Sequence, residues 1–293
     1  MRKFLLNAFL MCFSAAAFAQ GKDVYLFSYF KGNGEDGLHF AYSEDGYKWS
    51  ALRGDSSFLK PTAGQDKLMR DPCIIQGPDG LFHMVWTVSW HEKTIGYASS
   101  KDLVHWSEQQ NVPVMAHENA QNCWAPEIIY DAKGKQYMIY WATTIPGRFP
   151  ATDSLGDNNH RMYYVTTKDF KTYTPAKLLY DQGFNVIDAS IQPNGKQYLM
   201  FLKDETLKPQ PQKKLYLVTS KKLTGGYGKP TKPITGNYWA EGPTAIKIGN
   251  KWLVYFDKYT QHKYGVVTST DLVNWTEESE KLEMPKESAM VRC

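Results

Sequence analysis

The chain has 293 residues, a formal net charge of +4 and an aromatic content of 14%. Its 34 basic and 30 acidic residues are interspersed, with no Lys/Arg block or basic stripe, which argues against nucleic acid as a partner. Four cysteines do not make a disulfide framework in a chain of this length, and Cys73 and Cys123 are expected to be buried free thiols. The length suits one large domain or two small ones.

The N-terminal residues 1–19 have the pattern of a signal peptide. A basic start is followed by a mostly apolar run at 4–13, and Ala-Phe-Ala at 17–19 fits a cleavage site before Gln20. The apolar run is too short and too interrupted to span a membrane. We therefore expect cleavage and export to the periplasm or the extracellular space.

Short runs of alternating apolar and polar residues dominate the rest of the chain, whereas helical periodicity is scarce. Clear examples are residues 25–30, 82–88, 137–142 and 252–257, each bounded by Gly, Asn or Asp turns. Runs of this kind are typical of β-strands. The sequence therefore predicts an all-β fold.

An internal repeat organises these strands. Each copy has an apolar strand, a Gly turn, an aromatic-rich strand, a third strand that ends in Ser or Thr, and a closing Trp or Tyr. Four copies cover residues 70–106, 124–173, 187–227 and 240–275, and a partial copy covers residues 23–49. A period of about fifty residues with four strands per unit is typical of propeller blades. Residues 20–293 are thus predicted to form a single five-bladed β-propeller domain.

The partial copy at residues 23–49 lacks the first strand of a blade. In a closed ring, that inner strand comes from the C-terminal end of the chain. Because the sequence stops at Cys293, we expect this fifth blade to be truncated and to lack its inner strand. The aromatic residues Trp49, Trp106 and Trp275, which close three of the copies, are expected to pack between blades.

Carboxylates stand near the start of the inner strand in each of the four fuller copies, at Asp71, Glu127, Asp188 and Glu241. The inner strands of a propeller line its axis, so their first residues converge at one mouth of the central channel. Like charges that are brought together raise one another's pKa values. Such a cluster lowers the stability of the fold, so a purely structural role does not explain it. The cluster is therefore a candidate functional site.

The ordered motifs "RDP", "WAP", "ID" and "EGP", each at the start of a blade, resemble those of glycoside hydrolase family 43. The resemblance covers about residues 23–275. It implies that Asp71 is the general base, that Asp188 orients the acid and tunes its pKa, and that Glu241 is the general acid. Glu127 matches no catalytic member of this family, and we interpret it as a residue either of the pocket wall or of the layer behind that wall.

These residue types suit the hydrolysis of a glycosidic bond. One carboxyl protonates the leaving oxygen, and in an inverting enzyme a second one, about 6.5–9.5 Å away, activates a water molecule. The resemblance implies an inverting, exo-acting enzyme that releases a pentose, with α-L-arabinofuranose favoured, from plant-type polysaccharides or oligosaccharides. Trp90, Trp124 and Trp239 are expected to offer apolar faces to the sugar, and Arg292 to stand at the entrance of the fifth blade.

Other functions remain open. The same family includes β-xylosidases and β-galactosidases. A retaining, fructosidase-type propeller requires "NDP" and "EC" motifs, which are absent. An open ring favours a non-catalytic carbohydrate-binding propeller, in which Asp71 is a turn residue, Asp188 caps its strand, and Trp124 and Trp239 only pack in the wall.

No cofactor is expected, although a central structural calcium ion is left open. The seven histidines lack a metal-ligand spacing such as H-E-x-x-H. We expect a monomer whose partner is an oligosaccharide or polysaccharide. The long segment 145–159 is expected to contribute to function, with Arg148, His160 and Arg161 as further candidates for contacting the sugar.

Overall fold

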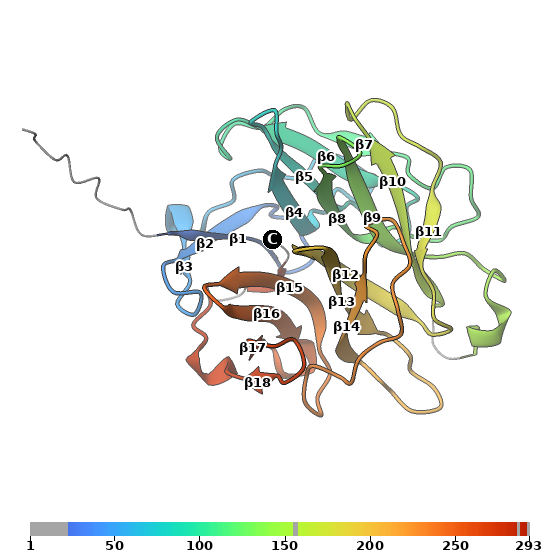
Figure 1. The fold of residues 1–293 in the computed structure, drawn as a ribbon. Helices are drawn as coiled ribbons and strands as arrows, with labels where there is room; N and C mark the ends of the chain where they lie inside the picture. Colours follow the sequence, from blue (N-terminus) through green and yellow to red (C-terminus); the bar gives the residue numbers. More distant parts are fainter. Residues whose placement is uncertain (1–22, 155–157, 286–287, 292–293) are drawn as a thin grey trace, which may run out of the picture.

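The computed structural model describes residues 23–154, 158–285 and 288–291. Their strands form five sheets arranged around a central axis, which confirms the prediction of an all-β, five-bladed propeller (Figure 1). Neighbouring strands within each sheet are antiparallel. The expected signal peptide and Arg292 lie outside the described residues, so both remain predictions.

Each sheet is built from an inner strand at the axis to an outer strand at the rim. The sheets, each from its inner strand outward, are as follows: β19 (Ser288–Val291), β1 (Tyr25–Lys31), β2 (His39–Ser43) and β3 (Ser50–Ala51); β4 (Arg70–Gln76), β5 (Phe82–Thr87), β6 (Ile95–Ser100) and β7 (Gln110–Val112); β8 (Trp124–Asp131), β9 (Gln136–Thr144), β10 (His160–Thr167) and β11 (Lys177–Tyr180); β12 (Val186–Asn194), β13 (Gln197–Asp204) and β14 (Lys214–Ser220); β15 (Glu241–Ile248), β16 (Lys251–Lys258), β17 (Lys263–Ser269) and β18 (Thr276–Glu277). Four short 3-10 helices cover Leu52–Asp55, Pro150–Thr152, Tyr259–Gln261 and Ser279–Lys281.

The expectation of a truncated blade without an inner strand is wrong. The strand β19 pairs antiparallel with β1, with Val291 opposite Tyr29 and Ser288 opposite Lys31. The main chain of four residues is enough to supply this ladder, although so short a segment shows too little alternation to be recognised as a strand. A second difference concerns the sheet β12–β14, which has three strands rather than the four expected for a blade.

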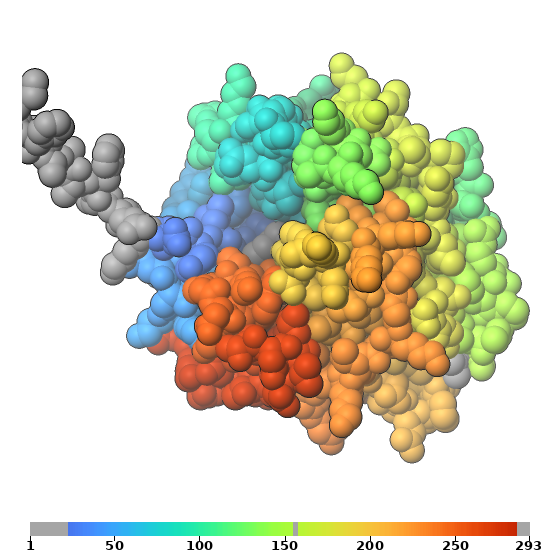
Figure 2. All heavy atoms as spheres, viewed as in Figure 1, coloured from blue at the N-terminus to red at the C-terminus, as the bar shows by residue number. Residues whose placement is uncertain are grey.

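The hydrophobic core is divided among the interfaces between neighbouring sheets. Between the second and third sheets, for example, Val85 packs in one cluster with Ile139 and Trp141. Trp49 lies 4.8 Å from Phe27, ring centroid to ring centroid, in the cluster between the first and fifth sheets. In the space-filling view the blue first sheet lies against the red fifth sheet, so the ring is closed by side-chain packing as well as by β19 (Figure 2).

The interpretation of the outer aromatics as packing residues agrees with the structure. Trp49 is buried, Trp106 is partly buried against the cluster between the first and second sheets, and Trp275 is partly buried against the cluster between the fourth and fifth sheets. Large aromatic side chains bury more apolar area than any other residue type, so they contribute strongly to the attachment of one blade to the next.

A bulge at the start of the inner strand sets the geometry of the mouth in four of the sheets. The pairing register shifts at this point in β4, β8, β12 and β15. In each bulge one residue has a left-handed conformation: Asp71 (φ 51°), Ala125 (φ 53°), Asp188 (φ 55°) and Gly242 (φ 60°). Left-handed backbone is unfavourable for residues other than glycine, and bulges commonly re-aim side chains next to functional sites.

This alignment shows that the four carboxylates are not equivalent. Asp71 and Asp188 occupy the left-handed position itself, Glu241 stands one residue before it, and Glu127 stands two residues after it. Because side chains alternate between the faces of a strand, such offsets decide which groups reach the axis and at what depth.

Candidate active site

The mouth of the propeller holds an axial cavity of about 200 Å³. Its walls come from all four of the bulged strands, from the strand ends beside them and from the loop that follows β5. The lining residues are Arg70, Asp71, Thr87, Trp90, Trp124, Ala125, Ile187, Asp188, Glu205 and Glu241. The three predicted catalytic residues and two of the three predicted tryptophans are thus brought together, from sheets that are far apart in sequence.

Asp71 is buried and oriented by a hydroxyl group. Thr87, at the end of β5, donates a hydrogen bond from Oγ1 to Asp71 Oδ2 at 2.9 Å. The same hydroxyl oxygen accepts the backbone N–H of Ala125 at 2.7 Å, so its own proton is directed toward the carboxylate. The second and third sheets therefore cooperate to fix the Asp71 carboxyl at the cavity wall.

Asp188 is buried and contacts the backbone beside Glu241. Its Oδ2 accepts a hydrogen bond from the N–H of Gly242 at 3.0 Å. The side chain of Asp188 thus joins the fourth sheet to the bulge of the fifth sheet, in which Glu241 and Gly242 are adjacent. The bond goes to the backbone of another sheet rather than to the strand of Asp188 itself, and it places the Asp188 carboxylate near the predicted acid.

Glu241 is a carboxyl of the cavity lining whose acidity is altered by its surroundings. Burial raises its pKa to about 7, and the charges of Asp188 and Asp257 act in the same direction. The ammonium group of Lys203 opposes them, because its Nζ lies 2.8 Å from Glu241 Oε2. The side chain keeps 18% of its surface exposed, so it remains accessible from the cavity.

Lys203 is the site residue that sequence reasoning missed. Its side chain is only 1% exposed, and its Nζ lies 2.6 Å from Glu205 Oε2 in addition to its contact with Glu241. Glu205 forms a further ion pair with Lys213. Burial by itself lowers the pKa of Lys203, but the charges of Glu241 and Glu205 outweigh burial and raise that pKa above its usual value.

A signal for Lys203 exists in the sequence. The apolar run "YLMFL" in β13 ends in a lysine, and a charge at the end of a core strand is costly unless it is paired. In the register, Lys203 lies opposite Ile187, just as Thr87 lies opposite Arg70 in the second sheet. Comparison of the repeats at this position would have identified both residues as groups that support the site.

Asp257 is a second group near the acid that sequence reasoning did not identify. It lies opposite Glu241 in the ladder between β15 and β16. Burial raises its pKa to about 6, against the lowering effect of Lys203. Glu241 and Asp257, both in the fifth sheet, therefore have pKa values close to neutral pH. A change in the charge of either one changes the electrostatic potential at Lys203.

Trp90 and Trp124 form one wall of the cavity. The indole Nε1 of Trp124 donates to the backbone oxygen of Trp90 at 2.9 Å, and the two rings meet edge to face at 5.4 Å between centroids. The guanidinium carbon of Arg70 lies 4.2 Å from the centroid of the Trp90 ring. Trp90 is 37% exposed, so this wall presents both an aromatic surface and a cation to a ligand.

The remaining predicted site residues lie elsewhere. Glu127 is buried behind the cavity, where it accepts a hydrogen bond from Tyr140 Oη at 2.5 Å, because its position two residues into the bulge carries it away from the mouth. Trp239 does not line the axial cavity either: its ring is partly exposed and lies 5.9 Å from that of Tyr259. Trp239 belongs to the loop before β15, two residues ahead of Glu241.

The charged candidates around segment 145–159 also have other partners. Arg148 pairs with Glu118 at 2.7 Å, and Arg161 is buried with its Nε 2.6 Å from Asp181. His160 is buried, and burial lowers its pKa to about 3. None of these three side chains lines the axial cavity.

Within the part of the chain that the structure describes, no three His, Cys, Asp or Glu side chains lie close enough to hold a metal ion. Over the same residues, no helix is long and apolar enough to cross a membrane. Cys73 and Cys123 are buried, and neither takes part in a disulfide among the described residues, as expected.

The fold and the carboxylate-lined mouth define a propeller of the glycosyl hydrolase class. More particularly, the chain belongs to the family related to glycoside hydrolase family 43, because the model of that family, described as a probable glycosyl hydrolase domain, matches residues 22–290. The resemblance that the motifs suggested is thereby confirmed.

Individual relatives are more distant. An α-L-arabinofuranosidase of Bifidobacterium longum subsp. longum is 25% identical over 124 residues, which make up 36% of this chain but only 11% of that much longer protein.

Solved structures share the fold. An exo-1,5-α-L-arabinanase from a bovine ruminal metagenomic library has a TM-score of 0.60 at 17% identity, over 89% of this chain and 94% of that chain. An α-L-arabinofuranosidase from Lactobacillus brevis has a TM-score of 0.56 at 20% identity, over 72% of each chain. An exo-β-1,3-galactanase from Phanerochaete chrysosporium has a TM-score of 0.53 at 14% identity, over 71% of this chain and 49% of that chain.

Proposed function

We propose that the chain is an inverting, exo-acting glycoside hydrolase that releases α-L-arabinofuranose from oligosaccharides or polysaccharides. The observation that carries this proposal is the axial cavity, in which Asp71, Asp188 and Glu241 meet and Glu241 has a pKa of about 7. A carboxyl with this pKa is partly protonated at neutral pH and can therefore act as an acid. The cavity volume of about 200 Å³ suits one small sugar unit rather than a chain.

In the proposed reaction, Asp71 accepts a proton from a water molecule while the water oxygen bonds to the anomeric carbon. The glycosidic C–O bond breaks at the same time, and Glu241 transfers its proton to the leaving oxygen. Thr87 and Ala125 hold the base in one orientation through the hydrogen bonds described above. Proton exchange with solvent returns both carboxyls to their starting states.

The preference for arabinofuranose rests on the names of relatives, two of which are α-L-arabinofuranosidases and one an exo-1,5-α-L-arabinanase. A β-galactosidase is the second candidate, because a galactanase shares the fold. A β-xylosidase is kept in the comparison because the motifs resemble those of a family that includes such enzymes. In each case we propose export by the sequence at residues 1–19, which N-terminal sequencing of the secreted protein would test.

A side-by-side assay tests the proposal. Three substrates are compared: 4-nitrophenyl α-L-arabinofuranoside, β-D-xyloside and β-D-galactoside. Each is assayed with the wild-type protein, with the Asp71→Asn variant and with an Asp23→Asn control at an exposed position. We expect turnover of the arabinofuranoside, its loss in Asp71→Asn and no change in Asp23→Asn. Proton NMR should show the β anomer as the first product, since water attacks directly. Turnover of none of the three, or retention of configuration, contradicts the proposal.

A further inference from the structure

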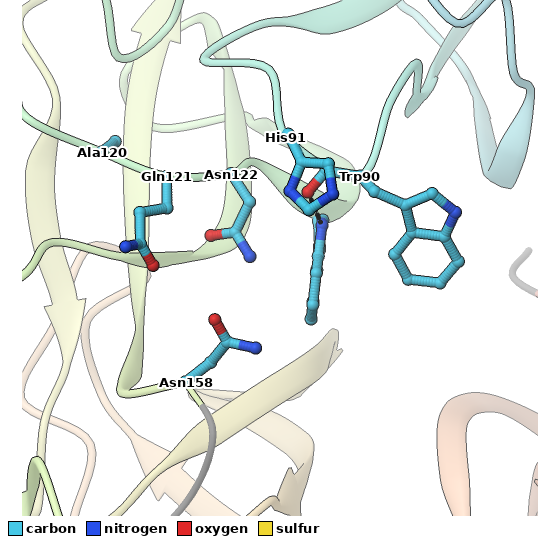
Figure 3. Close-up of a pocket in the computed structure, with 7 residues that line it drawn as sticks. Trp90, His91, Ala120, Gln121, Asn122 and Asn158 are labelled. Carbon is cyan, nitrogen blue, oxygen red and sulfur yellow. Dashed lines mark hydrogen bonds between the residues drawn. The ribbon is translucent and has the colours of Figure 1, made fainter.

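A second cavity, of about 560 Å³, opens beside the axial cavity on the same face of the propeller. It is lined mainly by Trp90, His91, Gln121, Asn122, Trp124 and Asn158. These residues come from the loop after β5, the segment before β8, the first residue of β8 and the loop before β10 (Figure 3). Trp90 and Trp124 line both cavities, so the two spaces share one aromatic wall.

The chemistry of the second cavity is neutral and polar. No Asp, Glu, Lys or Arg is among the described residues that line it, in contrast to the charged axial cavity. Figure 3 shows the amide groups of Gln121, Asn122 and Asn158 turned toward the same space. Each amide offers both a donor and an acceptor, which matches the paired donor and acceptor character of a sugar hydroxyl.

Part of this cavity is held rigid. Asn122 is 2% exposed, its Oδ1 accepts the N–H of Thr144 at 2.9 Å, and its Nδ2 lies 2.9 Å from His160 Nε2. The His160 ring in turn lies 4.7 Å from the ring of Trp124, centroid to centroid. A preorganised wall of this kind reduces the entropy lost when a ligand binds.

Two amides remain available for a ligand. The hydrogen bonds found for Gln121 and Asn158 within the described residues use only their main chains: Gln121 donates its N–H to Thr144, and Asn158 accepts a bond at its carbonyl oxygen. Their side-chain amides face the cavity without such an engagement (Figure 3). The volume falls in the range of small-molecule sites and exceeds that of the axial cavity.

We propose that this cavity is a second subsite, which binds an uncharged sugar unit of the substrate whose reacting unit occupies the axial cavity. The assignment rests on the proposed function for the identity of the substrate. The bound oligosaccharide passes from one cavity to the other along the shared wall of Trp90 and Trp124. The described residues of the lining are uncharged, and we therefore expect neutral sugar units to bind here.

The kinetic test compares two substrates in three variants. The kcat/KM for α-1,5-linked arabinotriose, which is long enough to reach both cavities, is divided by that for 4-nitrophenyl α-L-arabinofuranoside. Gln121→Ala and Asn158→Ala should each lower this ratio about three- to tenfold, as expected for the loss of a neutral hydrogen bond. Gln197→Ala, at an exposed glutamine that begins β13, should leave it unchanged. An unchanged ratio in both cavity variants overturns the subsite.

A binding test separates the subsite from the catalytic proposal. Calorimetry measures the affinity of arabinotriose for the Asp71→Asn protein, with and without Gln121→Ala or Asn158→Ala. Weaker binding in the cavity variants supports the subsite even if the wild-type protein cleaves no aryl glycoside, a result that would refute only the proposed function. Equal binding in all of them overturns the subsite even if the wild-type protein is an active arabinofuranosidase.

Discussion

The ammonium group of Lys203 lies 2.8 Å from Glu241 Oε2, on the far side of the carboxyl from the bulk solvent. The same group contacts Glu205, and its Nζ is 4.7 Å from the centroid of the Tyr259 ring. A buried cation between two carboxylates stabilises their charged forms, whereas burial of Glu241 favours its neutral form. The acidity of Glu241 is therefore set by a balance of opposing effects, and that balance can be altered by mutation.

The first prediction concerns pH. If Glu241 is the acid, its protonated form is the active one, and a pKa of about 7 means that this form is lost as the pH rises through 7. We expect kcat/KM for an alkyl or phenyl glycoside to fall tenfold per pH unit well above pH 7. A profile that stays flat from pH 6 to pH 9 would exclude Glu241 as the acid.

The second prediction concerns Lys203→Met. Because Lys203 lowers the pKa of Glu241, its loss should move the basic limb of the kcat/KM profile upward by about one pH unit or more. Lys203→Arg keeps the charge and should leave the limb nearer its original position. Lys203→Met should also be less stable, since Glu205 and Glu241 lose their shared partner, and thermal unfolding measures this cost. If the limb stays in place while only the stability falls, Lys203 has a purely structural role.

The third prediction tests whether Glu241 is the proton donor to the leaving oxygen. Glu241→Gln should lower kcat on alkyl glycosides about 100-fold or more, because the leaving oxygen then has no proton donor. The loss should be much smaller for a 2,4-dinitrophenyl glycoside, which departs without protonation. Glu280→Gln, at an exposed position in the short helix Ser279–Lys281, is the matched control. Equal losses on both substrates would argue for a role in binding rather than proton transfer.

The fourth prediction concerns the closure of the ring. Ending the chain at Pro285 removes β19 and leaves β1 as an unpaired edge. We expect the melting temperature to fall by several degrees and the amides of β1 at its Lys31 end to exchange faster, while those of β9 change less. Internal strands of the other sheets serve as the reference within the same experiment. Unchanged exchange in β1 would show that β19 contributes little to closure.

Much of the fold could be predicted from local patterns. The alternation of residues in runs such as 137–142 and the turns after them depend only on neighbours in sequence, and the repetition of this unit defined the blades. The positions of Asp71, Asp188 and Glu241 near the starts of inner strands followed from the same repeat. Their convergence in one cavity is a consequence of the propeller geometry.

The remaining features depend on register and on contacts between distant segments. The carboxylates stand at different offsets from the left-handed residue of their bulges, and the offset of Glu127 places it outside the lining of the axial cavity. The sequence by itself determined the blades and placed four carboxyls near the starts of their inner strands, because periodicity is local. Only the tertiary structure decided that Lys203 lies beneath Glu241 and that β19 closes the ring, because a buried ion pair and a four-residue strand are defined by partners far away in the chain.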